Sequence, residues 1–110
     1  MFRLIAFLFL SISVFCAGAQ VNKDALWAVW SDEAQPDTVR LKAIDDLAWE
    51  GYLFSQPDSA YYFAGLEYEL AKKKGLKKYQ ASALNIQGVS HKHRGNYYDA
   101  LDYYIRSLKL

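Results

Sequence analysis

Apolar residues recur at intervals of three or four along most of this chain, the spacing that favours amphipathic α-helices. Five segments show it: 20–34, about 37–53, about 57–74, about 77–93, and 97 to the last residue, 110. No stretch alternates between apolar and polar residues, so strands are not expected. The pattern predicts an all-α protein of antiparallel helical hairpins, each with an apolar side that a neighbouring hairpin must cover.

Turn-forming residues stand where the predicted helices meet. Pro36 and Pro57 each lie between a glutamine and an aspartate. Proline suits the first turn of a helix, where its missing N–H costs nothing, and the aspartate complements the positive end of the helix dipole. Gly75 follows three lysines and is expected to end its helix in the left-handed conformation. Gly95 and Asn96 are expected to form the hinge of the last hairpin.

Residues 1–19 have the layout of a secretory signal peptide. MFR is a short basic start, residues 4–15 are almost entirely apolar, and Ala17 and Ala19 place small residues at −3 and −1 of a cut before Gln20. Twelve helical residues span about 18 Å, short of the roughly 30 Å of bilayer hydrocarbon, which disfavours a retained membrane anchor. A lipid anchor on Cys16 is a second alternative, disfavoured because the residues before it are not small. We expect export to the periplasmic or extracytoplasmic side.

Removal of the signal peptide changes the charge and the cysteine content. The chain has 13 Lys and Arg and 12 Asp and Glu; cleavage removes Arg3 and no acid, giving 12 − 12 = 0. A neutral chain gives no reason to expect nucleic acid or an anionic membrane surface as a partner. Membrane contact is expected only through the signal or a later anchor. Cys16 is the only cysteine, so helix packing and not disulfides must stabilise the exported protein.

Small and apolar residues recur at an offset of 40 positions. The matched pairs are Leu41 with Ala81, Ile44 with Leu84, Ala48 with Gly88, and Ala60 with Ala100. A recurrence of this kind predicts an array of helical hairpins. We therefore divide the chain into a capping helix at 20–34, a first helix pair at 37–80 and a second at 81–110.

The second pair resembles the tetratricopeptide repeat (TPR) signature, and the first resembles it more loosely. In that family a small residue of the first helix meets a small residue of the second, with large residues flanking them. The resemblance implies a right-handed α-solenoid fragment of about two repeats. The positions that carry it are Ile44, Ala48, Ala60, Ala64, Leu84, Gly88, Gly95, Tyr97, Ala100, Tyr104 and Ser107.

Several positions depart from the family pattern. The offset is 40 instead of the usual 34, which implies longer helices or a longer link near Gly75. Gly51, Gln87 and His91 stand where large apolar residues are usual, and Glu67 interrupts the apolar stripe of its helix. Parts of the sequence also resemble the exported sensor regions of bacterial TPR proteins. In those proteins an adenylate or guanylate cyclase domain or a histidine kinase domain follows the repeats.

The resemblance also implies a binding groove, lined by outward-facing positions of the first helix of each pair. By position these are Lys42, Asp45, Trp49, Tyr52, Asn85, Val89, Lys92 and His93. Such a groove suits an extended peptide or a helix, with tryptophan and tyrosine supplying most of the affinity. The alternative for Trp49 is that it packs against Trp27 or Trp30.

No arrangement of residues predicts catalysis or a cofactor. His91 and His93 are two apart and point about 200° from each other on a helix, whereas metal binding from adjacent turns needs a separation of three or four. Asp46 and Glu50 form a like-charge pair best explained as a solvated helix face. We expect no catalytic site, no metal and no cofactor within these residues.

The sequence thus favours a non-enzymatic, exported helical-repeat module that binds a protein or peptide segment. The alternative is the sensory input region of a membrane-bound signalling enzyme. The last helix has an apolar face and no polar closing helix after it, so self-association through that helix is a further expectation.

Overall fold

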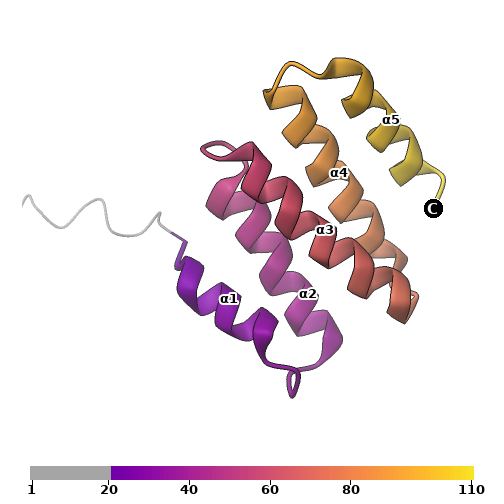
Figure 1. Cartoon of the computed structure of the whole chain (residues 1–110). Helices are drawn as coiled ribbons and strands as arrows, with labels where there is room; N and C mark the ends of the chain where they lie inside the picture. The colour runs from indigo at the N-terminus through magenta and orange to yellow at the C-terminus, as the bar shows by residue number, and fades with distance from the viewer. Residues whose placement is uncertain (1–20) are drawn as a thin grey trace, which may run out of the picture.

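The computed structural model describes residues 21–110, which form five α-helices, one π-helical segment and no strand. Figure 1 shows the elements in chain order: α1 (Lys23–Ser31), α2 (Asp37–Asp46), η2 (Leu47–Tyr52), α3 (Pro57–Lys74), α4 (Lys77–His93) and α5 (Tyr97–Leu108). The predicted all-α class is confirmed. The signal-peptide prediction for 1–19, with Cys16, lies outside the described residues. None of the described helices is both long and apolar enough to cross a bilayer.

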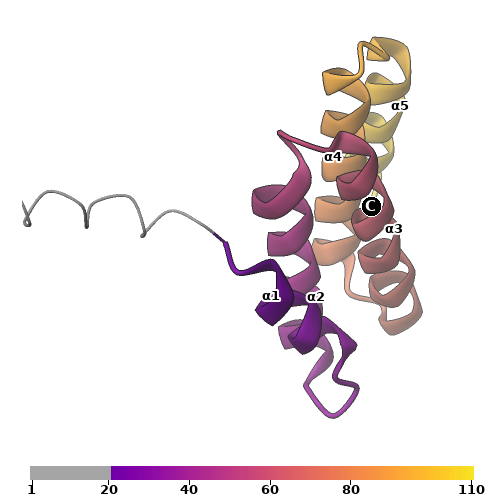
Figure 2. The same cartoon turned by 60° about the vertical axis from the view of Figure 1, so that its left-hand side comes forward.

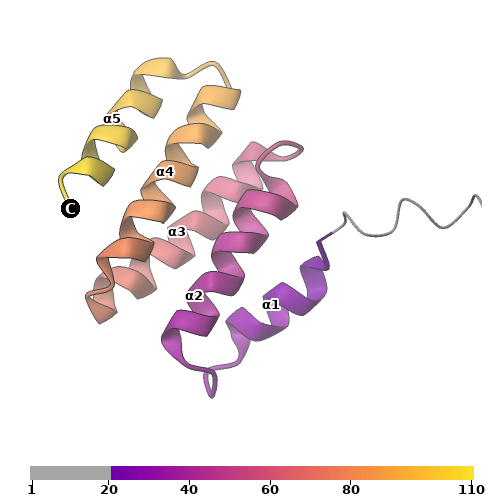
Figure 3. The same cartoon turned by 180° about the vertical axis from the view of Figure 1, so that it is seen from behind.

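The helices from α2 onward lie in two layers. α2 contacts α3, α3 contacts α4, and α4 contacts α5, while α1 lies along α2 and η2. In Figure 2, α2 and α4 form one layer and α3 and α5 the other. Seen from behind in Figure 3, α2 and α4 are side by side, and they are also in direct contact. This leaves one surface made by α2, η2 and α4, and a free outer side on α5.

Local sequence explains where the helices begin and end. The Asn22 side chain accepts a hydrogen bond of 3.0 Å from the Ala25 N–H and caps α1. Pro57 is the first residue of α3. Gly75 and Gly95 follow α3 and α4 with φ of 70° and 80°, a left-handed conformation that favours glycine. Pro57, Gly75 and Gly95 therefore begin or end helices as predicted, whereas Pro36 lies just before α2, as its N-cap residue.

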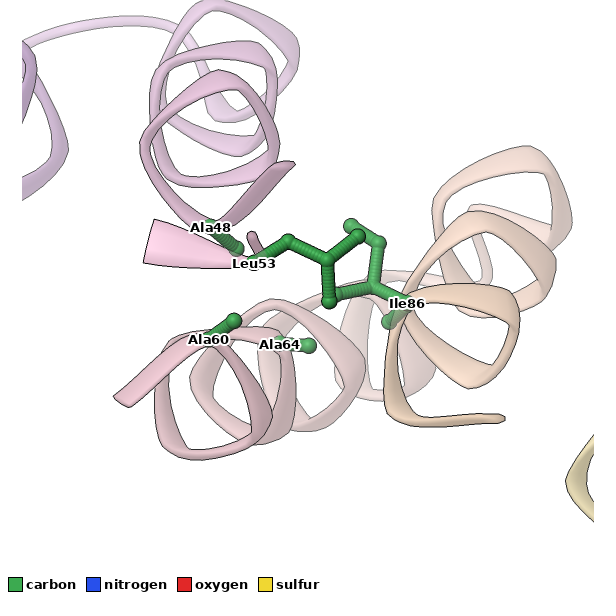
Figure 4. Close-up of a cluster of buried hydrophobic side chains, with 6 residues drawn as sticks. Ala48, Leu53, Ala60, Ala64 and Ile86 are labelled. Atoms are coloured by element: carbon green, nitrogen blue, oxygen red, sulfur yellow. The ribbon is translucent and has the colours of Figure 1, made fainter. Parts of the chain in front are cut away.

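Small residues allow the first layer to pack closely on the second. Figure 4 shows Leu53 and Ile86 pointing toward each other between η2, α3 and α4. Ala48, Ala60 and Ala64 lie beside them in the same buried cluster. Alanine keeps the helix backbones close, and the two branched side chains fill the space that remains.

α4 and α5 cross at Gly88. A β-carbon built on Gly88 would lie 2.6 Å from the Tyr104 ring, closer than real β-carbons come, and at a tight 3.3 Å from the Ala100 carbonyl oxygen. One turn away, Ser107 Oγ donates a hydrogen bond of 3.1 Å to the Ala81 carbonyl. The smallest side chain thus stands where the two helices come closest.

The segment predicted as one helix over 37–53 changes its hydrogen bonding at Leu47. The Leu53 N–H donates to the Ala48 carbonyl at 3.0 Å, an i to i+5 bond of the π-helical kind. The π-helical turn holds one extra residue, so positions after it are rotated by about 100° relative to a continuous α-helix. Extrapolating the face of α2 therefore fails at Tyr52, the last residue of η2.

Two other expectations differ from the structure. Tyr97, assigned to packing, is 67% exposed, because it is the first residue of α5 and side chains there lean back past the helix start. The predicted division at 80/81 falls inside α4. Gly75 ends α3, and the next helix already begins at Lys77. The first hairpin is therefore α2 with η2 and α3, and the second is α4 with α5.

Candidate binding face

The predicted groove positions lie mainly on the layer formed by α2, η2 and α4. On α4 they follow steps of three or four residues, which places them along one side of the helix. We define the α2–α4 face by seven of the eight predicted positions: Lys42, Asp45, Trp49, Asn85, Val89, Lys92 and His93. Val89 is partly buried against the core, and Asn85, Lys92 and His93 are exposed.

An exposed aromatic group occupies one end of this face. Phe54 lies between two helices, with its ring centre 6.0 Å from that of Trp49 and 5.3 Å from that of His93. Both contacts are edge-to-face. Trp49 is 41% exposed and Phe54 69% exposed. The three rings connect η2 to the end of α4 and present apolar surface to solvent.

The structure places Trp49 away from the other tryptophans. The Trp27 ring packs against Phe63 at 5.8 Å, and the Arg40 guanidinium lies 5.0 Å from the centre of the Trp30 ring. Arg40 also donates a hydrogen bond of 2.8 Å to the Trp30 carbonyl. Trp27 and Trp30 therefore hold α1 against the first hairpin, and the expected alternative contact of Trp49 with either of them is not formed.

Charged and polar groups occupy the other end of the face. The Lys42 ammonium lies 3.0 Å from the Asp46 carboxylate, which raises the pKa of Lys42 through a hydrogen bond and opposite charge. Asp45 accepts a hydrogen bond from Ser82 Oγ and so links α2 to α4. The face is thus polar over α2 and aromatic over η2.

Beneath Asp45 lies a carboxyl group with no access to solvent. Glu67, on α3, is fully buried, and neither of its oxygens has a hydrogen-bond partner among the described residues. Burial, and after it the nearby negative charges of Asp45 and Asp46, raises the pKa of Glu67 to about 11. Glu67 is therefore neutral at pH 7.

Tyr52 does not belong to the face. The extra residue of η2 turns it toward α1 and α3, where its ring lies 5.1 Å from that of Phe63 and beneath the Lys23 ammonium at 4.2 Å. It lines a hollow of about 240 Å³ together with Lys23, Asp24, Trp27, Leu47 and Phe63. The groove prediction for Tyr52 is thus replaced by a place in this hollow between α1 and the first hairpin.

The histidines are used in aromatic contacts. His91 lies between the rings of Tyr61 and Tyr103, at 5.2 and 5.1 Å, and His93 contacts Phe54. Within 21–110, no group of three or more His, Cys, Asp or Glu side chains is arranged to hold a metal ion.

Three residues of this site were not predicted as site residues. Phe54 and Ser82 carry no signal in the sequence, because each gains its role from a contact with another helix. Glu67 did carry one, since it interrupts the apolar stripe of α3. A charged residue in a buried stripe is a sign of a polar partner across the core.

Comparisons with protein-family models, with curated proteins and with solved structures find no match for this chain.

Proposed function

We propose that this chain is a non-enzymatic, TPR-like helical-repeat module whose α2–α4 face binds a peptide or protein segment. The observation that supports this most directly is the exposed group of Trp49, Phe54 and His93. The resemblance of residues 81–110 to the TPR signature points to the same face, because that family binds along the first helices of its repeats.

The chemistry of the face indicates the kind of segment. Large exposed aromatic side chains supply most of the binding energy in protein interfaces when a partner buries them. Next to them Asn85 and Lys92 offer exposed amide and ammonium donors, suited to main-chain carbonyls. A short segment with an apolar or aromatic anchor, flanked by free backbone carbonyls, complements this arrangement.

Selection from a random peptide display library tests the proposal. We expect the full chain to enrich peptides with a common apolar anchor, and Phe54→Ser to weaken their binding at least about tenfold, because the central ring of the group is lost. The matched control is Leu101→Ser, which removes an exposed apolar side chain from α5 instead. Peptides that bind the Phe54 variant as well as the original chain exclude the α2–α4 face as their site.

Trp49→Ala separates binding from packing. Trp49 is 41% exposed and, among the described aromatic rings, contacts only the more exposed Phe54. We therefore expect the melting temperature of the Trp49→Ala variant to be lower than that of the original chain by no more than about 2 °C. Binding of the selected peptides should be lost. A fall of several degrees, measured by circular dichroism, means that Trp49 is a structural residue.

A further inference from the structure

The outer side of α5 carries a second apolar surface, separate from the α2–α4 face. α5 packs on α4 through Ala100, Ser107 and Tyr104. On its free side, Tyr97, Tyr98, Leu101, Ile105 and Leu108 are all exposed, with Tyr98 at 93% and Leu108 at 87%. Their spacing of three or four residues places them in one stripe along the helix. Figure 1 shows α5 at the edge of the molecule.

Charged residues flank this stripe in a definite order. Asp99 and Asp102 lie in the first half of α5, and Arg106 and Lys109 lie at its end. At about 100° per residue, Lys109 and Asp102 project from the flank beside Tyr98 and Ile105, Arg106 lies next to them, and Asp99 lies furthest from the stripe. Within 21–110 none of the four takes part in an ion pair. The Arg106 guanidinium rests over the Tyr103 ring at 4.8 Å.

We propose that this surface binds a second copy of the same chain, with the two α5 helices antiparallel. In an antiparallel pair the same flank of each helix faces its counterpart. We place the two-fold axis at the level of Tyr104. A residue of one copy then lies opposite the residue of the other copy whose number brings the sum of the two numbers to about 208. Asp102 of each copy then meets Arg106 of the other. In a parallel pair the charged flank of each helix lies on the opposite side of the interface from that of its partner and meets no opposite charge, so the charges favour the antiparallel arrangement.

The size of the surface sets the strength of the dimer. A helix of 12 residues is about 18 Å long, so the contact is smaller than the standard interface of about 1,600 Å². We expect reversible dimers at protein concentrations of about 10⁻⁵–10⁻⁴ M, weakened by salt because the flanking charges are exposed.

Charge reversal tests the arrangement, with sedimentation equilibrium of the full chain as the readout. Asp102→Arg alone and Arg106→Asp alone each place like charges opposite each other twice per dimer, and each should raise the dissociation constant at least about tenfold. The double variant D102R/R106D restores opposite charges and should return it to within about threefold of the original. Mixing the two single variants should give a heterodimer, since arginines then meet aspartates at both contacts.

The matched control is Glu69→Arg, a reversal at an exposed position of α3 that takes part in no ion pair within 21–110, and it should leave the dissociation constant unchanged. Circular dichroism of each variant checks that the helix content is retained. A chain that stays monomeric at all concentrations overturns the proposal. The proposal is also overturned if the single reversals leave the dissociation constant unchanged, or if the double reversal fails to restore it. In either case another surface must hold the dimer together. A monomer whose α5 instead captures a different protein overturns it equally. The result is independent of peptide binding at the α2–α4 face.

Discussion

Glu67→Gln should stabilise the protein at pH 7, by about 1–3 kcal/mol. The side chain is fully buried, and its pKa of about 11 means that the folded protein holds a proton there that the unfolded chain releases above pH 4.5. Glutamine has nearly the same shape and carries no charge in either state. The variant therefore removes the cost of taking up a proton on folding.

The raised pKa of Glu67 also makes the stability of the folded protein depend on pH. The pKa of Glu67 is higher in the folded state than its ordinary value of 4.5, so its stabilising contribution is complete below pH 4.5 and falls as the pH rises toward 11. The slope for one such proton is about 1.4 kcal/mol per pH unit. Urea unfolding at pH 5, 7 and 8.5 should show the original chain losing stability relative to Glu67→Gln by about that amount per unit.

The matched control for this experiment is Glu69→Gln. Glu69 lies on the exposed side of the same helix. The free energy of unfolding of the Glu69→Gln variant should therefore differ from that of the original chain by less than about 0.5 kcal/mol. If Glu67→Gln is less stable than the original chain at pH 7, or if the difference between them does not depend on pH, then the buried Glu67 carboxyl does not carry a proton in the folded protein.

Gly88→Ala should destabilise the protein by about 1–3 kcal/mol, although alanine is the better helix former. The new β-carbon would lie 2.6 and 2.8 Å from two atoms of the Tyr104 ring, with the Ala100 carbonyl oxygen close behind, so α5 must shift away from α4. Helix propensity works in the opposite direction by about 1 kcal/mol, and the steric effect is expected to exceed it.

Gly65→Ala is the matched control for Gly88→Ala. Gly65 lies inside α3, and a β-carbon there would be 3.6 Å from the Gln87 side chain, an ordinary contact. We expect this variant to gain about 0.5–1 kcal/mol, because alanine loses less backbone freedom on folding. Chemical denaturation of both variants measures the difference. Equal stabilisation by the two substitutions contradicts the close crossing of α4 and α5.

Local chemistry explains why the helices themselves could be predicted. Pro57, Gly75 and Gly95 act through their own backbone preferences, which depend little on the rest of the fold. The close crossing at Gly88 is also visible in the sequence, because a small residue stands there within an apolar stripe. These features determine element type and boundaries, and there the sequence and the structure agree.

The site was predicted less completely, because its residues depend on contacts between helices. The π-helical turn at Leu47–Tyr52 rotates Tyr52 away from the face, and nothing in the local sequence announces that extra residue. Phe54 lies just after η2 in a segment with no helical period, so its place between Trp49 and His93 appears only in three dimensions. Hydrophobic periodicity predicts which residues share a face within one α-helix. It does not predict that face beyond a change from α-helical to π-helical geometry.

The most direct test of the binding face is amide chemical-shift mapping of the ¹⁵N-labelled chain, titrated with a peptide from the display selection. We predict that the perturbed amides cluster on the α2–α4 face and at Phe54, within 42–54 and 82–93, with α1 and the outer side of α5 little changed. Perturbations centred on the hollow beside α1 or on α5 contradict the assignment of binding to this face.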